Sequence, residues 1–240
     1  MSDPNYTVDE LIGILQASSA INLIVEGDDE SFIFRRIREK LNSNVELLIC
    51  NTCTVLKELY KRKDEYKTAK TIFLADKDLG VFKPTILENG IIYSQGYSIE
   101  NDLLNNSVIW FFLSESEREN FDSDLRLILD WYNIEISKYL SNSDFKIKVN
   151  PKKIINNGSY LPEYNYVLSE KITNLIPKGK EKSYLRGKTL LKLLMKYLSD
   201  PKRGISYATS QIFDISLVDG KCDFCSIIMP LIIKEIEVLK

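Results

Sequence analysis

The sequence predicts an α/β fold, in which a small parallel sheet is flanked by helices and followed by a mostly helical C-terminal part. In the first hundred residues short apolar runs alternate with amphipathic segments, as in βαβ units. Beyond residue 100 the apolar residues recur with helical spacing instead. The 240 residues, 44% of them hydrophobic and 28% charged, suit one domain with an insertion or two small domains.

Each element has its own signal along the first half of the chain. A capping box, Thr7 with Glu10, opens a predicted helix that ends near Gln16. Further predicted helices rest on apolar residues at helical spacing, and predicted strands are short apolar runs bounded by polar residues. In chain order these are a strand at 21–25, a helix at 28–41, a strand at 45–49, a helix at 53–66, and strands at 71–75 and 91–93.

The second half is predicted to be mainly helical. Helices are expected at 124–140, 185–198 and 229–239, and residues 141–182, rich in Asn, Ser, Pro, Gly and Lys, are expected to form loops around short elements. We therefore expect an N-terminal helix within 1–20, a core at 21–105, and a helical, basic region at 106–240 that completes the domain.

Histidine is absent from the chain, and this restricts the chemistry. Serine or cysteine nucleophiles activated by imidazole, metal hydrolases with histidine ligands and histidine-dependent ribonucleases are all excluded. Carboxylates, lysines or cysteines would have to perform any catalysis.

The net charge of −2 hides an uneven distribution. Residues 146–203 contain 14 basic and 4 acidic residues, a balance of +10, so the remainder carries −12. An acidic part joined to a basic part suits a metal-dependent enzyme that acts on a phosphate-rich substrate. Two solvated surfaces of opposite sign are the simpler alternative.

Acidic residues stand where two predicted strands end. Glu26 follows the first strand, and Asp76 and Asp78 follow the third. Because parallel strands present their carboxyl ends at one edge of a sheet, these side chains are expected to converge. Clustered carboxylates repel one another unless a divalent cation neutralises them, and oxygen ligands favour Mg²⁺ or Mn²⁺. Helix caps or turn formers are the alternative roles for such residues.

These motifs resemble a known family. Ile-Val-Glu26-Gly27 followed by Phe-Leu-Ala-Asp76-Lys-Asp78 resembles the Toprim (topoisomerase–primase) domain over residues 20–105. Ser98-Ile-Glu100-Asn101 and Arg186-Gly187-Lys188 are similar to signatures of small stand-alone Toprim proteins in phage defence, including the effectors of the PARIS systems. The resemblance implies a Toprim-like small parallel sheet.

The resemblance also implies roles for single residues. Glu26 would be a metal ligand or a general acid/base, and Asp76 and Asp78 would be metal ligands. Glu30 and Glu100 would be further acidic ligands, and Lys188 would contact the phosphate or the transition state. Glu30 and Glu100 could instead be ordinary acids of a helix start, and Lys188 a solvated lysine.

The implied function is that of a Mg²⁺-dependent endonuclease in abortive phage defence. Its implied substrate is transfer RNA, and an ABC-type ATPase is the implied partner that releases it. Three alternatives stay open. They are a DNA-nicking Toprim enzyme, a haloacid-dehalogenase-like phosphatase using Asp76, Asp78 and Lys188, and a non-catalytic module that binds the ATPase.

Tyrosines are interleaved with the lysines of the basic region, a pattern that is consistent with binding of single-stranded RNA. Aromatic rings beside cations can stack on unpaired bases, although tyrosines at this density are also common in helix cores. Four residues are the predicted phosphate-facing patch: Lys178, Lys180, Lys182 and Arg186.

Other motifs carry less weight. Gly187-Lys188-Thr189 looks like the end of a Walker A loop, but Lys182 stands where its first glycine belongs. Two Cys-x-x-Cys pairs, Cys50/Cys53 and Cys222/Cys225, are not expected to bind zinc, since 168 residues separate them. No apolar run is long enough for a membrane span and no signal peptide is visible, so a cytoplasmic homodimer is expected.

Overall fold

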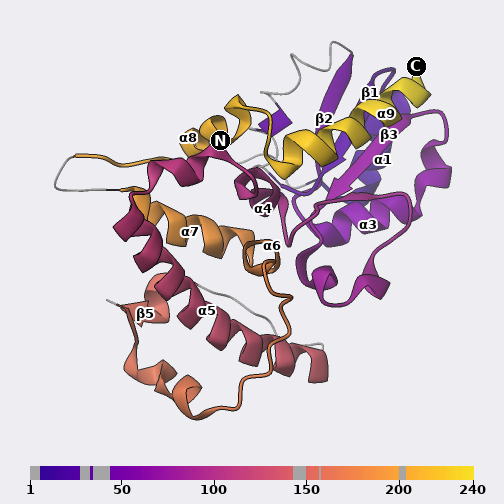
Figure 1. Cartoon of the computed structure of the whole chain (residues 1–240). Helices are drawn as coiled ribbons and strands as arrows, with labels where there is room; N and C mark the ends of the chain where they lie inside the picture. The colour runs from indigo at the N-terminus through magenta and orange to yellow at the C-terminus, as the bar shows by residue number, and fades with distance from the viewer. Residues whose placement is uncertain (1–5, 28–32, 35–43, 143–149, 157, 200–203) are drawn as a thin grey trace. The chain divides into compact units, whose positions relative to one another are not determined.

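The computed structural model describes residues 6–27, 33–34, 44–142, 150–156, 158–199 and 204–240. The chain divides into two compact units, which are described separately (Figure 1). The first unit consists of Met1–Ile99 together with Asp223–Lys240, and the second of Glu100–Cys222. The predicted helix over 28–41 lies, apart from residues 33–34, outside the described residues, and so does Glu30.

The first unit contains a four-stranded sheet in which all pairings are parallel. Its strand order is β2-β1-β3-β4, so the first strand in the sequence lies in the interior of the sheet. The strands are β1 (Ile21–Val25), β2 (Val45–Ile49), β3 (Lys70–Ala75) and β4 (Ile92–Tyr93). All four predicted strands and the α/β class are confirmed.

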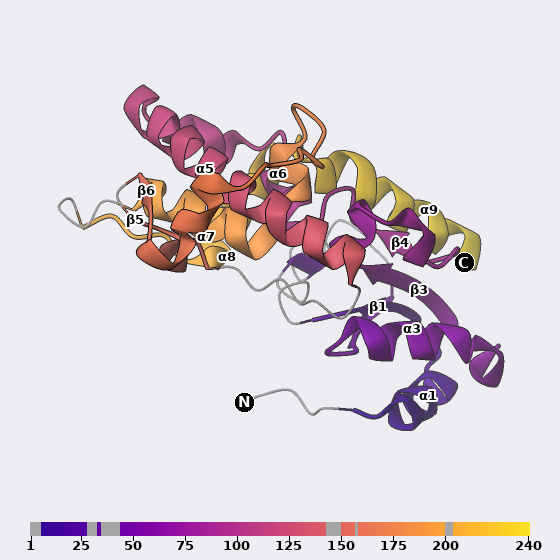
Figure 2. The ribbon, with the colours of Figure 1, turned by 90° about the horizontal axis from the view of Figure 1, so that it is seen from below.

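Helices cover both faces of this sheet (Figure 2). On one face lie α1 (Val8–Ala17) and α3 (Cys53–Lys61), and on the other lies α9 (Met229–Leu239), which contacts β3. The core under α1 and α3 includes Leu11, Leu15, Ile24, Leu48, Leu56, Leu59 and Phe73. Since side chains alternate along a strand, Leu23 and Ile72 point to the opposite face, where α9 buries Ile232 and Ile236.

Local signals explain where the helices of this unit begin and end. The capping box predicted for Thr7 and Glu10 is present at the start of α1. Thr52 caps α3 at its start. The helix ends at Lys61, with Arg62 as its C-cap, and is therefore shorter than the predicted 53–66; a 3₁₀ turn (Lys63–Tyr66) follows it. The helix predicted at 229–239 is confirmed as α9, and a π-helical turn, Phe224–Ile228, precedes it.

The second unit is mainly helical, with one short antiparallel hairpin. Its elements are the remainder of α4 (Ile99–Leu104), α5 (Glu115–Ser141), β5 (Ile155–Asn156), β6 (Ser159–Tyr160), α6 (Glu181–Tyr184), α7 (Gly187–Leu198) and α8 (Thr209–Val218). Helices α5 and α7 pack together, and the Asp124 carboxylate, 2% exposed, accepts from the Lys196 ammonium of α7 at 2.6 Å.

Several predicted bounds in this unit were wrong. Helix α5 begins nine residues before the predicted 124, because Ser114 and Glu117 form a capping box there. The helix predicted at 185–198 begins at Gly187, since Leu185 is extended and ends α6. Helix α8 was not predicted. No described helix is long and apolar enough to cross a membrane.

Candidate catalytic site

The first site residue is Glu26, which directly follows β1. Its carboxylate is largely buried and accepts hydrogen bonds from the backbone amides of Cys53 and Asp76. Oxygen Oε2 is buried and has no hydrogen-bond partner among the described residues. A buried carboxylate oxygen without a donor is costly, because water no longer solvates it. Glu26 therefore differs from an ordinary strand-end acid.

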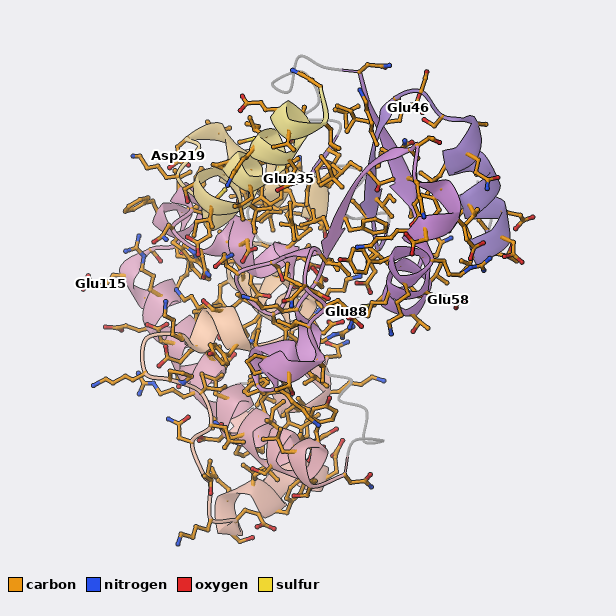
Figure 3. All side chains as sticks on the ribbon, turned by 90° about the vertical axis from the view of Figure 1, so that its right-hand side faces the viewer. Glu46, Glu58, Glu88, Glu115, Asp219 and Glu235 are labelled. Atoms are coloured by element: carbon orange, nitrogen blue, oxygen red, sulfur yellow. The ribbon has the colours of Figure 1, made fainter. Side chains whose placement is uncertain are left out.

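Three other acidic residues of the first unit are exposed to solvent, as most acidic side chains in proteins are. The side chains of Glu46, Glu58 and Glu235 are exposed and project from the surface (Figure 3). Their charges are solvated by water, so they cost the fold little. Burial singles out Glu26 from these three.

Asp76 and Asp78 follow β3, the neighbour of β1. Because the two strands are parallel and Ile24 pairs with Phe73, Glu26 and Asp76 emerge at the same edge of the sheet. Asp76 Oδ1 accepts from the Ile99 amide at 2.8 Å, which fixes the orientation of its carboxylate.

A second loop holds the acidic loop in place. The Lys77 amide donates to Ser94 Oγ at 2.9 Å, and the Asp78 amide donates to the Tyr97 carbonyl at 2.7 Å. Asp78 has a left-handed backbone, with φ of 49°, which is costly for most residues but tolerated by Asp. The loop of residues 94–99 thus fixes a strained conformation at the carboxyl edge of the sheet.

The pKa of the Glu26 carboxyl reflects its burial and its charged neighbours. Burial, and secondly the negative charge of Asp78, raise the pKa of the Glu26 carboxyl to about 7. The pKa of Glu26 is lowered, but by less, by the hydrogen bonds from the Cys53 and Asp76 amides and by the ammonium of Lys57. The surroundings of Glu26 therefore favour its protonated form more than water does.

Cys50 and Cys53 lie beside the carboxylate. Burial, followed by the charge of Glu26, raises the pKa of the Cys50 thiol to about 12 and that of the Cys53 thiol to about 11. Both are thiols at neutral pH and have little of the thiolate character that a reactive cysteine needs. The Cys53 backbone amide, at the start of α3, contacts Glu26, and the Cys-x-x-Cys pattern gave no sign of this role.

The remaining predicted residues belong to the second unit or are not described. Glu100 is buried in α4, and Lys188 is exposed in the first turn of α7. The structure thus places Glu26, Asp76 and Asp78 at one edge of the sheet, with the charge of Asp78 acting on Glu26. In the part of the chain that it describes, no three or more His, Cys, Asp or Glu side chains are arranged as a metal-binding group.

The predicted basic patch is heterogeneous. Lys178 and Lys180 are exposed, and Arg186 is half-buried at the N-terminal end of α7. The Lys182 ammonium lies 3.5 Å from the centre of the Trp110 ring, and burial lowers its pKa. Lys182 is thus held in a cation–π contact within its own unit.

Comparison with known proteins leaves the family open. No known protein family matches this chain, and no curated protein matches its sequence.

Proposed function

We propose that the chain is a metal-dependent Toprim endonuclease, and that it cleaves transfer RNA as a toxic effector of phage defence. The observation that carries the proposal is the Glu26 carboxylate, buried beside Asp78 at the carboxyl edge of a parallel sheet. A desolvated, poorly compensated carboxylate in such a place is typical of a functional group. The Toprim motifs assign a role to the same residues.

The residue types at this edge suit a hard divalent cation. Carboxylate oxygens are its preferred ligands, and Mg²⁺ commonly takes only one or two protein carboxylates, with water and substrate phosphate completing its shell. Glu26, with its unpartnered Oε2, and Asp76 and Asp78 would hold the ion. Mg²⁺ or Mn²⁺ bound there would supply positive charge to a phosphodiester under attack.

The residues of the chain have separate tasks in this proposal. Glu26 would either bind the ion through Oε2 or, where Asp76 and Asp78 alone bind it, accept the proton of the attacking water. The Ile99 amide would keep the Asp76 carboxylate oriented, and the Tyr97 carbonyl would keep the Asp78 backbone in place. No histidine is required.

The substrate and the partner are the less direct part of the proposal. The motifs resemble AriB, the Toprim effector of the PARIS systems, which implies a transfer RNA substrate, an ABC-type ATPase partner and release from that partner on infection. The basic balance of residues 146–203 supports a phosphate-rich substrate. We include a homodimer in the proposal on the ground that symmetric dimers are the commonest assemblies.

The test compares Glu26→Gln with Glu58→Gln, an exposed glutamate of the same unit. Purified proteins are incubated with Mg²⁺ and with transfer RNA, plasmid or single-stranded DNA, in the presence and absence of EDTA. We expect transfer RNA fragments from the wild type and from Glu58→Gln, and a rate roughly 10²–10⁴ lower for Glu26→Gln. EDTA should stop the reaction.

Other outcomes point elsewhere. Nicked plasmid without RNA cleavage would move the chain to the DNA-cutting Toprim enzymes. Trapping of a fluoroberyllate adduct on Asp76 would indicate a phosphatase. Cleavage by Glu26→Gln at the wild-type rate would contradict the proposed site. If the isolated protein is silent, the assay is repeated with the ATPase partner and its trigger, and continued silence would favour a binding module.

A further inference from the structure

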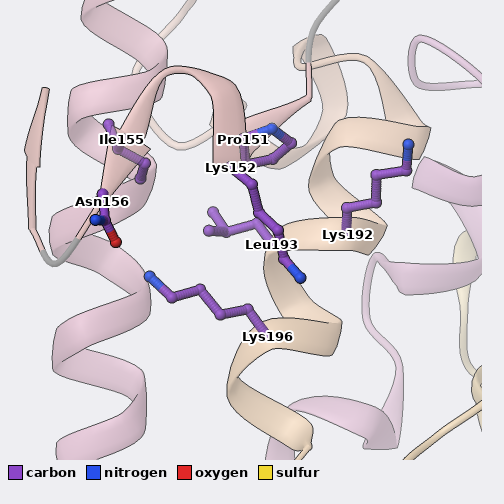
Figure 4. Close-up of a pocket in the computed structure, with 7 residues that line it drawn as sticks. All are labelled: Pro151, Lys152, Ile155, Asn156, Lys192, Leu193 and Lys196. Atoms are coloured by element: carbon purple, nitrogen blue, oxygen red, sulfur yellow. The ribbon is translucent and has the colours of Figure 1, made fainter. Parts of the chain in front are cut away.

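A second site lies wholly within the second unit. Its cavity of about 220 Å³ is lined by residues of α7, of the hairpin strand β5, and of the 3₁₀ turn Pro151–Lys153 that precedes this strand (Figure 4). Three of the lining side chains are lysines, Lys152, Lys192 and Lys196, and none is acidic. The predicted basic patch does not include any of them.

The charges of this cavity are only partly compensated. Lys196 is held by the buried Asp124 carboxylate at 2.6 Å, which fixes the position of its ammonium. Among the residues that the structure describes, Lys152 and Lys192 have no carboxylate partner. An anion in the cavity would give the ammonium of Lys152 a partner.

The directions of the side chains place two of the ammonium groups toward the cavity. Figure 4 shows Lys152 extending toward α7 and Lys196 extending toward Asn156, while the Lys192 ammonium points away from both. Lys152 and Lys196 are thus the inner cations, and Lys192 contributes charge at the rim. Lysine binds phosphate as a point charge, without the fixed fork of arginine.

The rest of the lining is apolar, with one amide. Pro151, Ile155 and Leu193 are buried and form an apolar floor, and Asn156 offers an exposed side-chain amide. Such a lining suits a ligand with an anionic end and an apolar body, since cations, amide and apolar surface are all present. A bare inorganic anion would leave the floor without a contact.

We propose that this cavity binds one nucleotide unit, with its phosphate against Lys152 and Lys196 and its nucleoside against the apolar floor. The unit can belong to a free mononucleotide, as a phosphate monoester, or to an RNA strand, as a phosphodiester, because both join an anionic phosphate to a nucleoside. The proposal does not rest on the proposed nuclease function, since it concerns other residues and is tested by binding alone.

The experiment measures the binding of four probes to the full chain by calorimetry, at low salt and with EDTA. The probes are AMP, adenosine, inorganic phosphate and a five-nucleotide single-stranded RNA. The pocket variant is Lys152→Glu with Lys192→Glu, which leaves the Lys196 contact to Asp124 intact. The control is Lys171→Glu with Lys221→Glu, two exposed lysines of the same unit outside the cavity. Circular dichroism checks the fold, and Lys152→Gln alone replaces the pocket variant if that variant does not fold.

We expect AMP or the RNA to bind at least tenfold more weakly to the pocket variant than to the wild type, and the control to bind normally. Binding of AMP identifies a free nucleotide as sufficient, and binding of the RNA alone identifies a strand. Equal binding by the pocket variant and the wild type overturns the proposal, as does the absence of any binding. Inorganic phosphate binding as tightly as AMP overturns the role of the apolar floor.

Discussion

Glu26 shows how one residue's surroundings change its chemistry. Its sequence context, a carboxylate after an apolar strand, is common, and the exposed Glu46 and Glu58 of the same unit are chemically similar. The difference arises from burial, from the nearby Asp78 and from an oxygen that no described group contacts. In the metal-free protein this carboxylate should therefore oppose folding whenever it is ionised.

The stability of the metal-free protein should depend on pH through this residue. The pKa is raised from 4.5 to about 7 on folding, so the folded state binds the proton more tightly. The protonated Glu26 therefore contributes its full stabilisation of the folded state below about pH 4.5, and this contribution is lost as the pH rises through about 7. We expect Glu26→Gln to be more stable than the wild type at pH 8 by about 1–3 kcal/mol.

Urea unfolding in EDTA, at pH 5 and at pH 8, measures this difference. Glu58→Gln is the matched control and should follow the wild type at both pH values. If the free energies of unfolding of Glu26→Gln and the wild type differ equally at pH 5 and pH 8, the carboxylate does not titrate as described.

Helix α4 illustrates the element scale. Asn101 belongs to the Ser98-Ile-Glu-Asn motif, which resembles a signature of stand-alone Toprim proteins. In the structure its side-chain amide donates to the carbonyls of Lys182 and Leu185, at 2.5 and 2.8 Å, and it is fully buried. The motif residue thus ties α4 to the segment around α6, which is a structural task within the second unit.

Asn101→Ala should therefore destabilise the protein by about 2 kcal/mol, because two carbonyls lose their donor. Asn105→Ala is the control from the next turn, where the side chain donates only to the partly buried hydroxyl of Ser183. Asn105→Ala should lower the free energy of unfolding by about 0.5–1 kcal/mol. Urea unfolding of both variants gives the comparison, and equal losses would show that the Asn101 contacts contribute nothing special.

The elements themselves were predictable to different degrees. Strands β1 to β4 were predicted from short apolar runs, and α1 from its capping box. The start of α5 was missed although Ser114 and Glu117 carry the same signal, because the apolar spacing becomes helical only further on. The place of α9 against β3 depends on contacts between residues far apart in sequence, which no local pattern encodes.

The candidate site was predictable only in part, for a similar reason. That Glu26, Asp76 and Asp78 follow strands ending at one edge of the sheet was predicted, because it depends only on parallel pairing of β1 with β3. The burial of Glu26 and its contact with the Cys53 amide depend on how α3 packs, and so does its raised pKa. The loop of residues 94–99 gave no sign that its backbone would hold the acidic loop.

At the scale of the whole molecule, charge is distributed unevenly along the chain. Residues 146–203 carry a balance of +10 within a chain of net charge −2. If this region binds RNA, each phosphate contact releases counterions, and affinity falls with salt. The exposed Lys178 and Lys180 should contribute to this dependence.

We expect the dissociation constant for transfer RNA, measured by fluorescence anisotropy in EDTA, to rise roughly 50-fold between about 50 and 200 mM KCl, as for about four phosphate contacts. Lys178→Gln with Lys180→Gln should reduce the slope of the logarithm of the dissociation constant against the logarithm of the KCl concentration by about 1.4. Lys83→Gln with Lys234→Gln, exposed lysines of the first unit, should leave it unchanged. A slope unaffected by the first pair would remove these lysines from the interface.

The discontinuous first unit has a consequence for the order of synthesis. A ribosome makes β3 and the acidic loop roughly 150 residues before α9, the helix that covers the other face of β3. At about 5–20 residues per second this interval lasts roughly 8–30 s. During that time β3 lacks its contacts with α9, so the first unit is complete only after the whole second unit has been translated. A toxic enzyme built in this order would not act while its own chain is still growing.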